Sequence, residues 1–170
     1  MRARDYKEWY KIVRPIITSC EYKKRKYYRH HGDVSVYDHC IKVSLGAYAL
    51  AKKLHMDYRS AAIAGVLHDF YTTPWQDVMI QQPFFQRHAF SHAKCALENS
   101  RKYFGKYLNP KIENAILRHM FPLNITPPKS SIGYIITIVD KAKSMDFVFC
   151  KETWAKTLGL RALKKKRKSN

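Results

Sequence analysis

Hydrophobic residues recur every three or four positions along most of the chain, which is the spacing of one face of an α-helix. The segment 35–54 is the clearest case, and its shared face holds Val36, His39, Cys40, Val43, Ala47, Leu50 and Leu54. The next run, RSAAIAGVLHDF, is rich in small residues that permit close packing against neighbours. The pattern predicts helices over about 5–20, 35–54, 59–70, 91–104, 110–119 and 131–149.

Proline and asparagine positions divide this pattern into separate elements. Pro15 is expected to strain or interrupt the first helix. Asn109 and Pro110 are typical of a helix start, with asparagine as the N-cap and proline in the first helical position. A loop rich in proline and glutamine is expected over 72–87. The run IGYIITIV has the β-branched residues of a strand, but strand alternation is weak throughout, so we predict an all-α fold.

The 170 residues contain no internal repeat and no low-complexity linker, which indicates one domain. We expect this domain to span 1–150, with its core at about 31–149, followed by a C-terminal helix and basic tail at 151–170. No stretch resembles a transmembrane span or a secretory signal. The four cysteines lie far apart, which favours free thiols in a reducing compartment, so a cytoplasmic protein is expected.

The formal charge of +19 changes the picture, because it favours anionic partners. Nucleic acid, nucleotides, phosphorylated metabolites and anionic membrane surfaces all qualify. Basic residues cluster at Lys23–Lys26 and at Lys164–Lys168. Each cluster is either an ordinary solvated surface or an electrostatic funnel for phosphates, and charge alone does not decide between the two.

Metal-ligand residue types fall at the inward faces or ends of successive predicted helices. They are His39, the adjacent His68 and Asp69, a histidine of the pair His88 and His92, His119, and Asp140. A carboxylate inside an apolar run such as IITIVDK is costly to bury unless it is paired or binds metal. Imidazoles and carboxylates on inward faces of different helices are what a metal site in a helical bundle requires. These ligands suit Fe, Mn, Co, Ni or Zn rather than Ca.

The order H…HD…H…H…D resembles the HD-domain superfamily of metal-dependent phosphohydrolases. The residues that carry the resemblance are SVYDHCIKVS, GVLHDF, FSHAKCALENS, AILRHMFPL and IVDK, within 31–149. The full set is similar to the branch with additional histidines and two metals, as in HD-GYP phosphodiesterases and symmetrical diadenosine tetraphosphate hydrolases. The resemblance implies a helical bundle that holds two divalent transition-metal ions and activates hydroxide to hydrolyse a nucleotide or other small phosphoester.

Residue roles follow from this resemblance. The metal ligands are expected to be His39, His68, Asp69, His92, His119 and Asp140, with Asp69 able to bridge the ions. His92 is preferred to His88 as a ligand because a small residue lies four positions after it and because it is nearer to His119. Asp69 and His88 are the candidates for handling the proton, and His88 remains the alternative ligand.

The chain also departs from the family pattern. Many relatives have a lysine three residues after the HD aspartate to hold phosphate, and Thr72 stands there instead. The GYP signature is absent, which argues against cyclic di-GMP as the substrate. Arg87, Lys94, Arg118 and Lys141 adjoin the expected ligands, so they are candidates for substrate binding or ordinary surface residues.

Two other functions are compatible with the sequence. A few HD-superfamily members are di-iron oxygenases, which depend on iron and oxygen. A nucleic-acid-binding protein with a structural metal site is favoured by the net charge and by the stretch YKKRKYYRHH, since aromatic side chains stack on bases and cations neutralise phosphates. The substrate, the metal and the oligomeric state stay open.

Overall fold

The computed structural model describes residues 2–31, 34–71 and 88–148, with only the backbone given for 30, 31, 88–91 and 145–148. Its helices are α1 (Ala3–Ile17), α2 (Cys20–Lys23), α3 (Val36–Lys53), α4 (Tyr58–Leu67), α6 (His88–Phe104), α7 (Pro110–Arg118) and α8 (Ser131–Val148). There are also two 3₁₀ turns, η1 (Lys24–Tyr27) and η3 (Gly105–Tyr107). Two short strands, β1 (Arg29–His31) and β2 (Val34–Ser35), pair in antiparallel orientation. The predicted all-α fold is confirmed. The loop expected at 72–87 and the tail expected at 151–170 lie outside the described residues.

Side-chain caps set the start of the helices that carry the site. The Ser35 hydroxyl accepts from the Asp38 amide at the start of α3, at 3.0 Å. Asn109 accepts from the Ile112 amide at 2.9 Å, with Pro110 as the first residue of α7, as the sequence predicted. Because a cap determines where the first turn begins, it also determines which side chains face inward.

Helix boundaries differ from the prediction at the end of α1 and at the start of α6. α1 continues through Pro15 and ends at Ile17, after which Ser19 caps a separate short helix, α2. α6 begins at His88, three residues before the predicted start. The run IGYIITIV lies in α8, where Ile132, Ile135, Ile136 and Val139 are buried at helical spacing. None of the described helices has the length and hydropathy of a membrane span.

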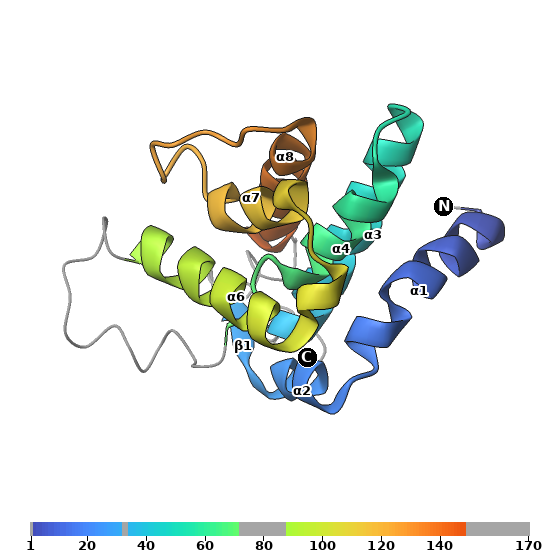
Figure 1. Cartoon of the computed structure of the whole chain (residues 1–170), viewed down its shortest axis with the longest axis horizontal. Helices are drawn as coiled ribbons and strands as arrows, with labels where there is room; N and C mark the ends of the chain where they lie inside the picture. Colours follow the sequence, from blue (N-terminus) through green and yellow to red (C-terminus); the bar gives the residue numbers. More distant parts are fainter. Residues whose placement is uncertain (1, 32–33, 72–87, 149–170) are drawn as a thin grey trace, which may run out of the picture.

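Helices α3 and α4 occupy the centre, with α1 on one side and α6, α7 and α8 on the other (Figure 1). Two glycines let backbones approach closely at this centre. A Cβ on Gly65 of α4 would lie 2.5 Å from the Ser44 Cα of α3, and one on Gly46 of α3 would lie 2.7 Å from Val139 Cγ1 of α8. The absence of side chains at these positions therefore allows α3 to pack tightly against both α4 and α8.

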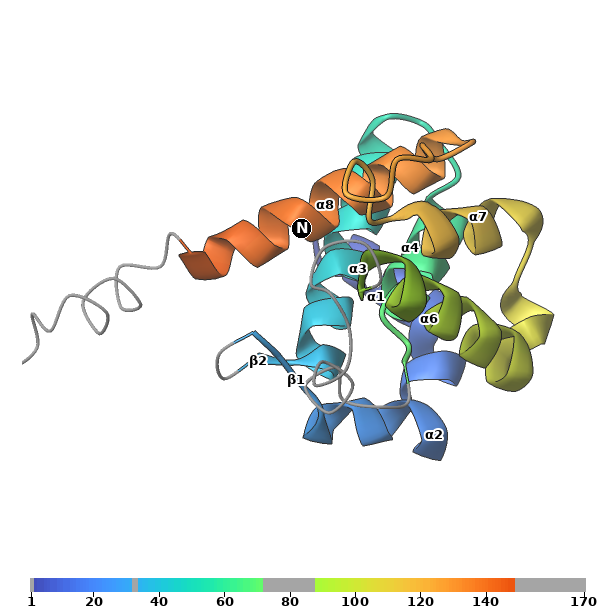
Figure 2. The ribbon, with the colours of Figure 1, turned by 90° about the vertical axis from the view of Figure 1, so that its left-hand side faces the viewer.

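The predicted inward face of α3 is correct over its first turns and wrong at its end. Val36, His39 and Val43 are buried, whereas Leu54 lies beyond the helix and is exposed. Ser44 is also buried, where its hydroxyl accepts from Trp9 Nε1 of α1 at 2.9 Å and donates to the Ala62 carbonyl of α4 at 2.7 Å. One hydroxyl therefore links three helices. Figure 2 shows the β1–β2 ladder near α2, and the C-terminal part of α8 extending beyond the bundle.

Candidate metal centre

The six predicted ligands come together in two groups of three. The first triad is His39, His68 and Asp140, and the second triad is Asp69, His92 and His119. Within each triad the potential ligand atoms all lie within 4.8 Å of one another. They come from α3, the end of α4, α6, the end of α7 and α8, so five segments distant in the sequence converge on one place.

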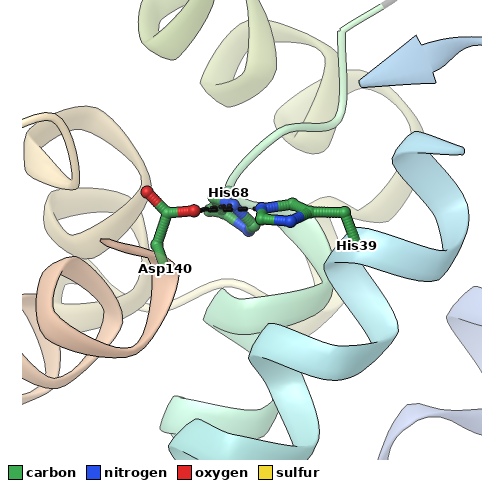
Figure 3. A group of neighbouring side chains, drawn as sticks. All are labelled: His39, His68 and Asp140. Atoms are coloured by element: carbon green, nitrogen blue, oxygen red, sulfur yellow. Dashed lines mark hydrogen bonds and ion pairs between the residues drawn. The ribbon is translucent and has the colours of Figure 1, made fainter. Parts of the chain in front are cut away.

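In the first triad the three side chains point toward one another from three different helices (Figure 3). His39 Nε2 lies 3.0 Å from Asp140 Oδ1. His68 Nε2 lies 3.5 Å from the same oxygen, which is too long for a normal hydrogen bond. Both imidazoles are buried, and the Asp140 side chain is 13% exposed. The first triad is therefore a nearly dry group of two imidazoles and one carboxylate.

The second triad has the same composition. His92 Nε2 lies 3.2 Å from Asp69 Oδ1 and 3.1 Å from His119 Nε2. His119 Nε2 lies 3.5 Å from the same Asp69 oxygen. Two imidazole nitrogens and one carboxylate oxygen thus face a common point.

Asp69 connects the two triads through its two oxygens. Oδ1 faces His92 and His119 of its own triad, at the distances given above. Oδ2 lies 3.5 Å from Nε2 of His68, which belongs to the first triad. Adjacent residues at the end of α4 therefore serve different triads, and one carboxylate spans both.

His68 and His119 are oriented by the same local device. Each is the C-cap of its helix, α4 or α7, and keeps right-handed helical backbone angles. The Nδ1–H of His68 donates to the Gly65 carbonyl at 2.9 Å, and that of His119 donates to the Ile116 carbonyl at 2.7 Å. Because Nδ1 carries the proton, the Nε2 of each ring is the atom that can bind a metal.

The ends of α4 and α7 also favour a cation electrostatically. Both helices direct their C-termini, with their partial negative charge, toward the triads, since His68 and His119 occupy the C-cap positions. The field of two helix ends thus adds to the charges of Asp69 and Asp140.

The carboxylates of the centre are ionised. Burial acts to raise the pKa of Asp140, but the hydrogen bond with His39 and the proximity of His68 outweigh it and hold the pKa below its usual value. Burial likewise opposes ionisation of Asp69, whose pKa is held well below its usual value by the charge of His68 and by the nearby imidazoles of His119 and His92. Burial lowers the pKa of His119. The two ionised carboxylates, Asp69 and Asp140, therefore form a site that favours a cation.

The residues present fit a metal ion. Ligand atoms bonded to one ion at about 2.1 Å lie roughly 3.0–3.4 Å apart, for octahedral or tetrahedral geometry. The five distances given above, 3.0–3.5 Å, are close to that spacing. Two imidazoles and a carboxylate in each triad form a donor set suited to Mn, Fe, Co, Ni or Zn.

His92 reaches both Asp69 and His119 in the second triad, as its preferred role as a ligand requires. His88 is the first residue of α6, one turn earlier, and its side chain is outside the described part of the chain. The choice between them as ligand, and the proton-handling role expected for His88, remain predictions.

The four residues expected to bind substrate have different environments. Lys94 is exposed on α6, and its Nζ lies 3.9 Å from Glu98 Oε1. The Lys141 ammonium donates to the Phe121 carbonyl, which ties α8 to the turn after α7. Arg118 is half-buried, and its Nε has no hydrogen-bond partner among the described residues. Arg87 lies outside the described residues, and the substrate-binding role stays a prediction for all four.

Sequence reasoning missed two buried polar side chains, Tyr71, whose ring meets that of His92, and Arg25, which stacks on Phe70. Arg25 lies within the basic cluster Lys23–Lys26, yet only 1% of it is exposed. The available signal was the spacing of Tyr22, Arg25 and Tyr28, since residues three apart share a helical face. Tyr71 follows the HD pair by two residues and was not singled out.

Comparison with known families agrees with this geometry. A family model described as HD domain matches residues 36–145, which contain all six residues of the two triads. The comparisons with curated proteins and with solved structures gave no match. Since the match covers more than half of the chain, this protein belongs to the HD-domain family, whose members are generally metal-dependent hydrolases.

Proposed function

We propose that this protein is a metal-dependent phosphohydrolase that hydrolyses a nucleotide or another small phosphoester with two divalent transition-metal ions. The observation that carries the proposal is the position of Asp69, whose two oxygens face different triads. A carboxylate shared in this way is suited to hold two ions side by side. The net charge of +19 supports an anionic substrate.

Two bound ions of this kind lower the pKa of water and neutralise charge on phosphoryl oxygens. The chain's own part is to hold the ligand atoms in place before substrate arrives. Gly65 and Ile116 keep the imidazoles of His68 and His119 in the tautomer with a free Nε2. Both rings are buried, so water is excluded around them, which strengthens electrostatic interactions at the site.

Metal content of the protein purified without a histidine tag is the first test. We expect about two equivalents of a transition metal in the wild-type protein. An Asp69→Ala variant should lose most of both, because it removes the ligand that both triads share. His39→Ala and His92→Ala change one triad each and should each retain about one equivalent. Full occupancy in folded Asp69→Ala protein would contradict the shared site.

Activity is tested with bis-p-nitrophenyl phosphate and a panel of nucleotides, after reconstitution with each metal in turn. Hydrolysis should appear with metal and fall by at least about a hundredfold in Asp69→Ala, since loss of a metal ligand removes the ion's contribution to catalysis. Lys102→Gln is the control, because Lys102 is exposed in the last turn of α6, ten residues after His92, and has no predicted role in the site. Oxygen-dependent turnover restricted to iron, without hydrolysis, would replace the proposal with an oxygenase.

The compartment and the partners belong to the same proposal. Cys20, Cys40 and Cys95 are free thiols among the described residues, which fits the reducing cytoplasm expected from the sequence. A small anionic substrate is the partner that the metal centre favours. Binding of nucleic acid is favoured only by the net charge, the basic tail and the stretch YKKRKYYRHH.

A further inference from the structure

Arg25 is unlike the other basic residues of its cluster. Lys23, Lys24 and Lys26 are exposed, as expected for a solvated surface, but Arg25 is 1% exposed. A buried guanidinium is costly unless its charge and its five N–H donors are satisfied. The cluster therefore contains one cation whose burial needs an explanation.

Aromatic rings contact the guanidinium of Arg25, but few of its N–H donors have hydrogen-bond partners among the described residues. Its carbon lies 4.4 Å from the ring centre of Phe70 and 5.1 Å from that of Tyr28, so it stacks on aromatic rings. Nη2 donates to Glu21 Oε1 over a long 3.4 Å. Nε and Nη1 have no hydrogen-bond partner within the described ranges 2–31, 34–71 and 88–148. Stacking thus orients the group and leaves donors for another acceptor.

A second unused donor lies in the adjoining segment. The hydroxyl of Tyr71 is buried and likewise has no hydrogen-bond partner among the residues that the structure describes. Phe70 and Tyr71 directly follow Asp69, and the Tyr71 ring meets the His92 ring edge-on at 6.3 Å between centres. Burial and the charge of Asp69 raise the pKa of Tyr71, while the Arg25 guanidinium acts in the opposite direction. The hydroxyl therefore lies within electrostatic range of both Asp69 and Arg25.

We propose that Arg25 and the Tyr71 hydroxyl form a subsite that binds a phosphate group of the substrate beside the second triad. The inference rests on the proposed function, because this phosphate belongs to the molecule that is hydrolysed. A guanidinium held over aromatic rings presents its N–H groups in the geometry that phosphate oxygens accept. The subsite supplies the positive charge that is missing at Thr72.

Calorimetric titration of metal-free protein with inorganic pyrophosphate tests the subsite without metal binding or turnover. Wild-type protein should bind, and Arg25→Gln should weaken binding by at least about tenfold, as loss of a charged hydrogen-bond donor does. Tyr71→Phe keeps the ring and should weaken it by about threefold to tenfold. Lys23→Gln removes the same charge from the exposed surface nearby and should change it less than about twofold.

Thermal unfolding of the same proteins separates binding from folding. Pyrophosphate should raise the Tm of the wild-type protein and of Lys23→Gln, but not that of Arg25→Gln. Tyr71→Phe decides the question if Arg25→Gln does not fold. Unchanged pyrophosphate affinity in Tyr71→Phe and in folded Arg25→Gln overturns the subsite, and so does equal weakening by Lys23→Gln, which would indicate general attraction to a basic surface.

Parallel hydrolysis assays on metal-loaded protein distinguish the two proposals. Binding of pyrophosphate that depends on Arg25, in a protein without hydrolytic activity, supports the subsite and contradicts the phosphohydrolase function. Hydrolysis by the wild-type protein together with unchanged pyrophosphate binding in both variants contradicts the subsite alone.

Discussion

Individual residues at helix ends do most to orient this centre. His68 and His119 each cap a helix, donate to a carbonyl three residues back and direct Nε2 at the triads. The same bond satisfies a carbonyl that the end of a helix would otherwise leave without a partner. Stability and ligand geometry therefore depend on the same atoms.

Ser44 permits a test of buried hydrogen bonding at this scale. Ser44→Ala removes the acceptor of the Trp9 indole N–H and the donor to the Ala62 carbonyl. We expect a loss of about 1–3 kcal/mol in the free energy of unfolding, because the indole N–H stays buried without an acceptor. Urea unfolding measures it. Ser100→Ala is the control, since that buried hydroxyl donates only to the Ala96 carbonyl of its own helix, and an equal loss there would contradict the explanation.

At the scale of elements, close helix approach positions the ligands. The contacts of Gly65 with Ser44, and of Gly46 with Val139, bring α3 against α4 and α8. These are the three helices that supply or precede the first triad. The spacing between the potential ligand atoms thus depends on Gly65 and Gly46, the small residues where these helices cross.

Substituting Gly65 by alanine should separate α3 from α4. The added Cβ would meet backbone atoms of Ser44 at 2.5 and 2.9 Å, so one helix must move. We expect a loss of about 1–3 kcal/mol in stability from overpacking, with weaker metal binding because His68 moves with α4. Urea unfolding and metal titration measure the two effects. A Cβ on Gly105 meets nothing within 4 Å, so Gly105→Ala should leave metal affinity unchanged, and equal effects would exclude the steric cause.

Lys52 clamps α1 to α3 and makes this contact sensitive to acid. Its ammonium donates to Asp5 Oδ1 at 2.9 Å and also to Glu8. These hydrogen bonds lower the pKa of Asp5 from 3.8, and of Glu8 from 4.5, to about 2. Because the two pKa values are lower in the folded protein, ionised Asp5 and Glu8 stabilise it at any pH above their unfolded pKa values of 3.8 and 4.5. This stabilisation is lost as the pH falls toward about 2.

Lys52→Met should therefore reduce the free energy of unfolding at neutral pH and have progressively less effect below about pH 4.5. The clamp is accessible to solvent, so the loss should be small and should shrink in salt. Urea titrations across this range measure it. A difference between the two proteins that stays the same from neutral to strongly acidic pH would contradict the clamp. Lys53→Met, on the exposed side of α3, is the matched control.

For the whole molecule, the two triads join five segments, so metal binding should stabilise the entire fold. An ion that binds only the folded state at about 100 times its Kd adds about 2.7 kcal/mol. Manganese added to metal-free protein should therefore raise the Tm by several degrees, as calorimetry can measure. Asp69→Ala should show little of this rise, and an equal rise in that variant would place the bound metal elsewhere.

Much of the fold was predictable because its signals are local. Helical periodicity located the helices, and the chemistry of Asn109 and Pro110 predicted the start of α7. Predictions of helix boundaries were wrong where local signals are weak. α1 continues through Pro15, because the helix tolerates the missing N–H donor near its end. The run IGYIITIV was ambiguous in isolation, and packing on all but one side decided for a helix.

The sequence by itself determined the all-α fold, the ligand-type residues and their place at the ends and inward faces of helices, since these depend on neighbours within a turn or two. Only the tertiary structure decided the division into two triads, the position of Asp69 between them and the burial of Arg25. These depend on where helices far apart in the sequence cross. Contacts such as Gly65 with Ser44 determine those crossings, and no local pattern encodes them.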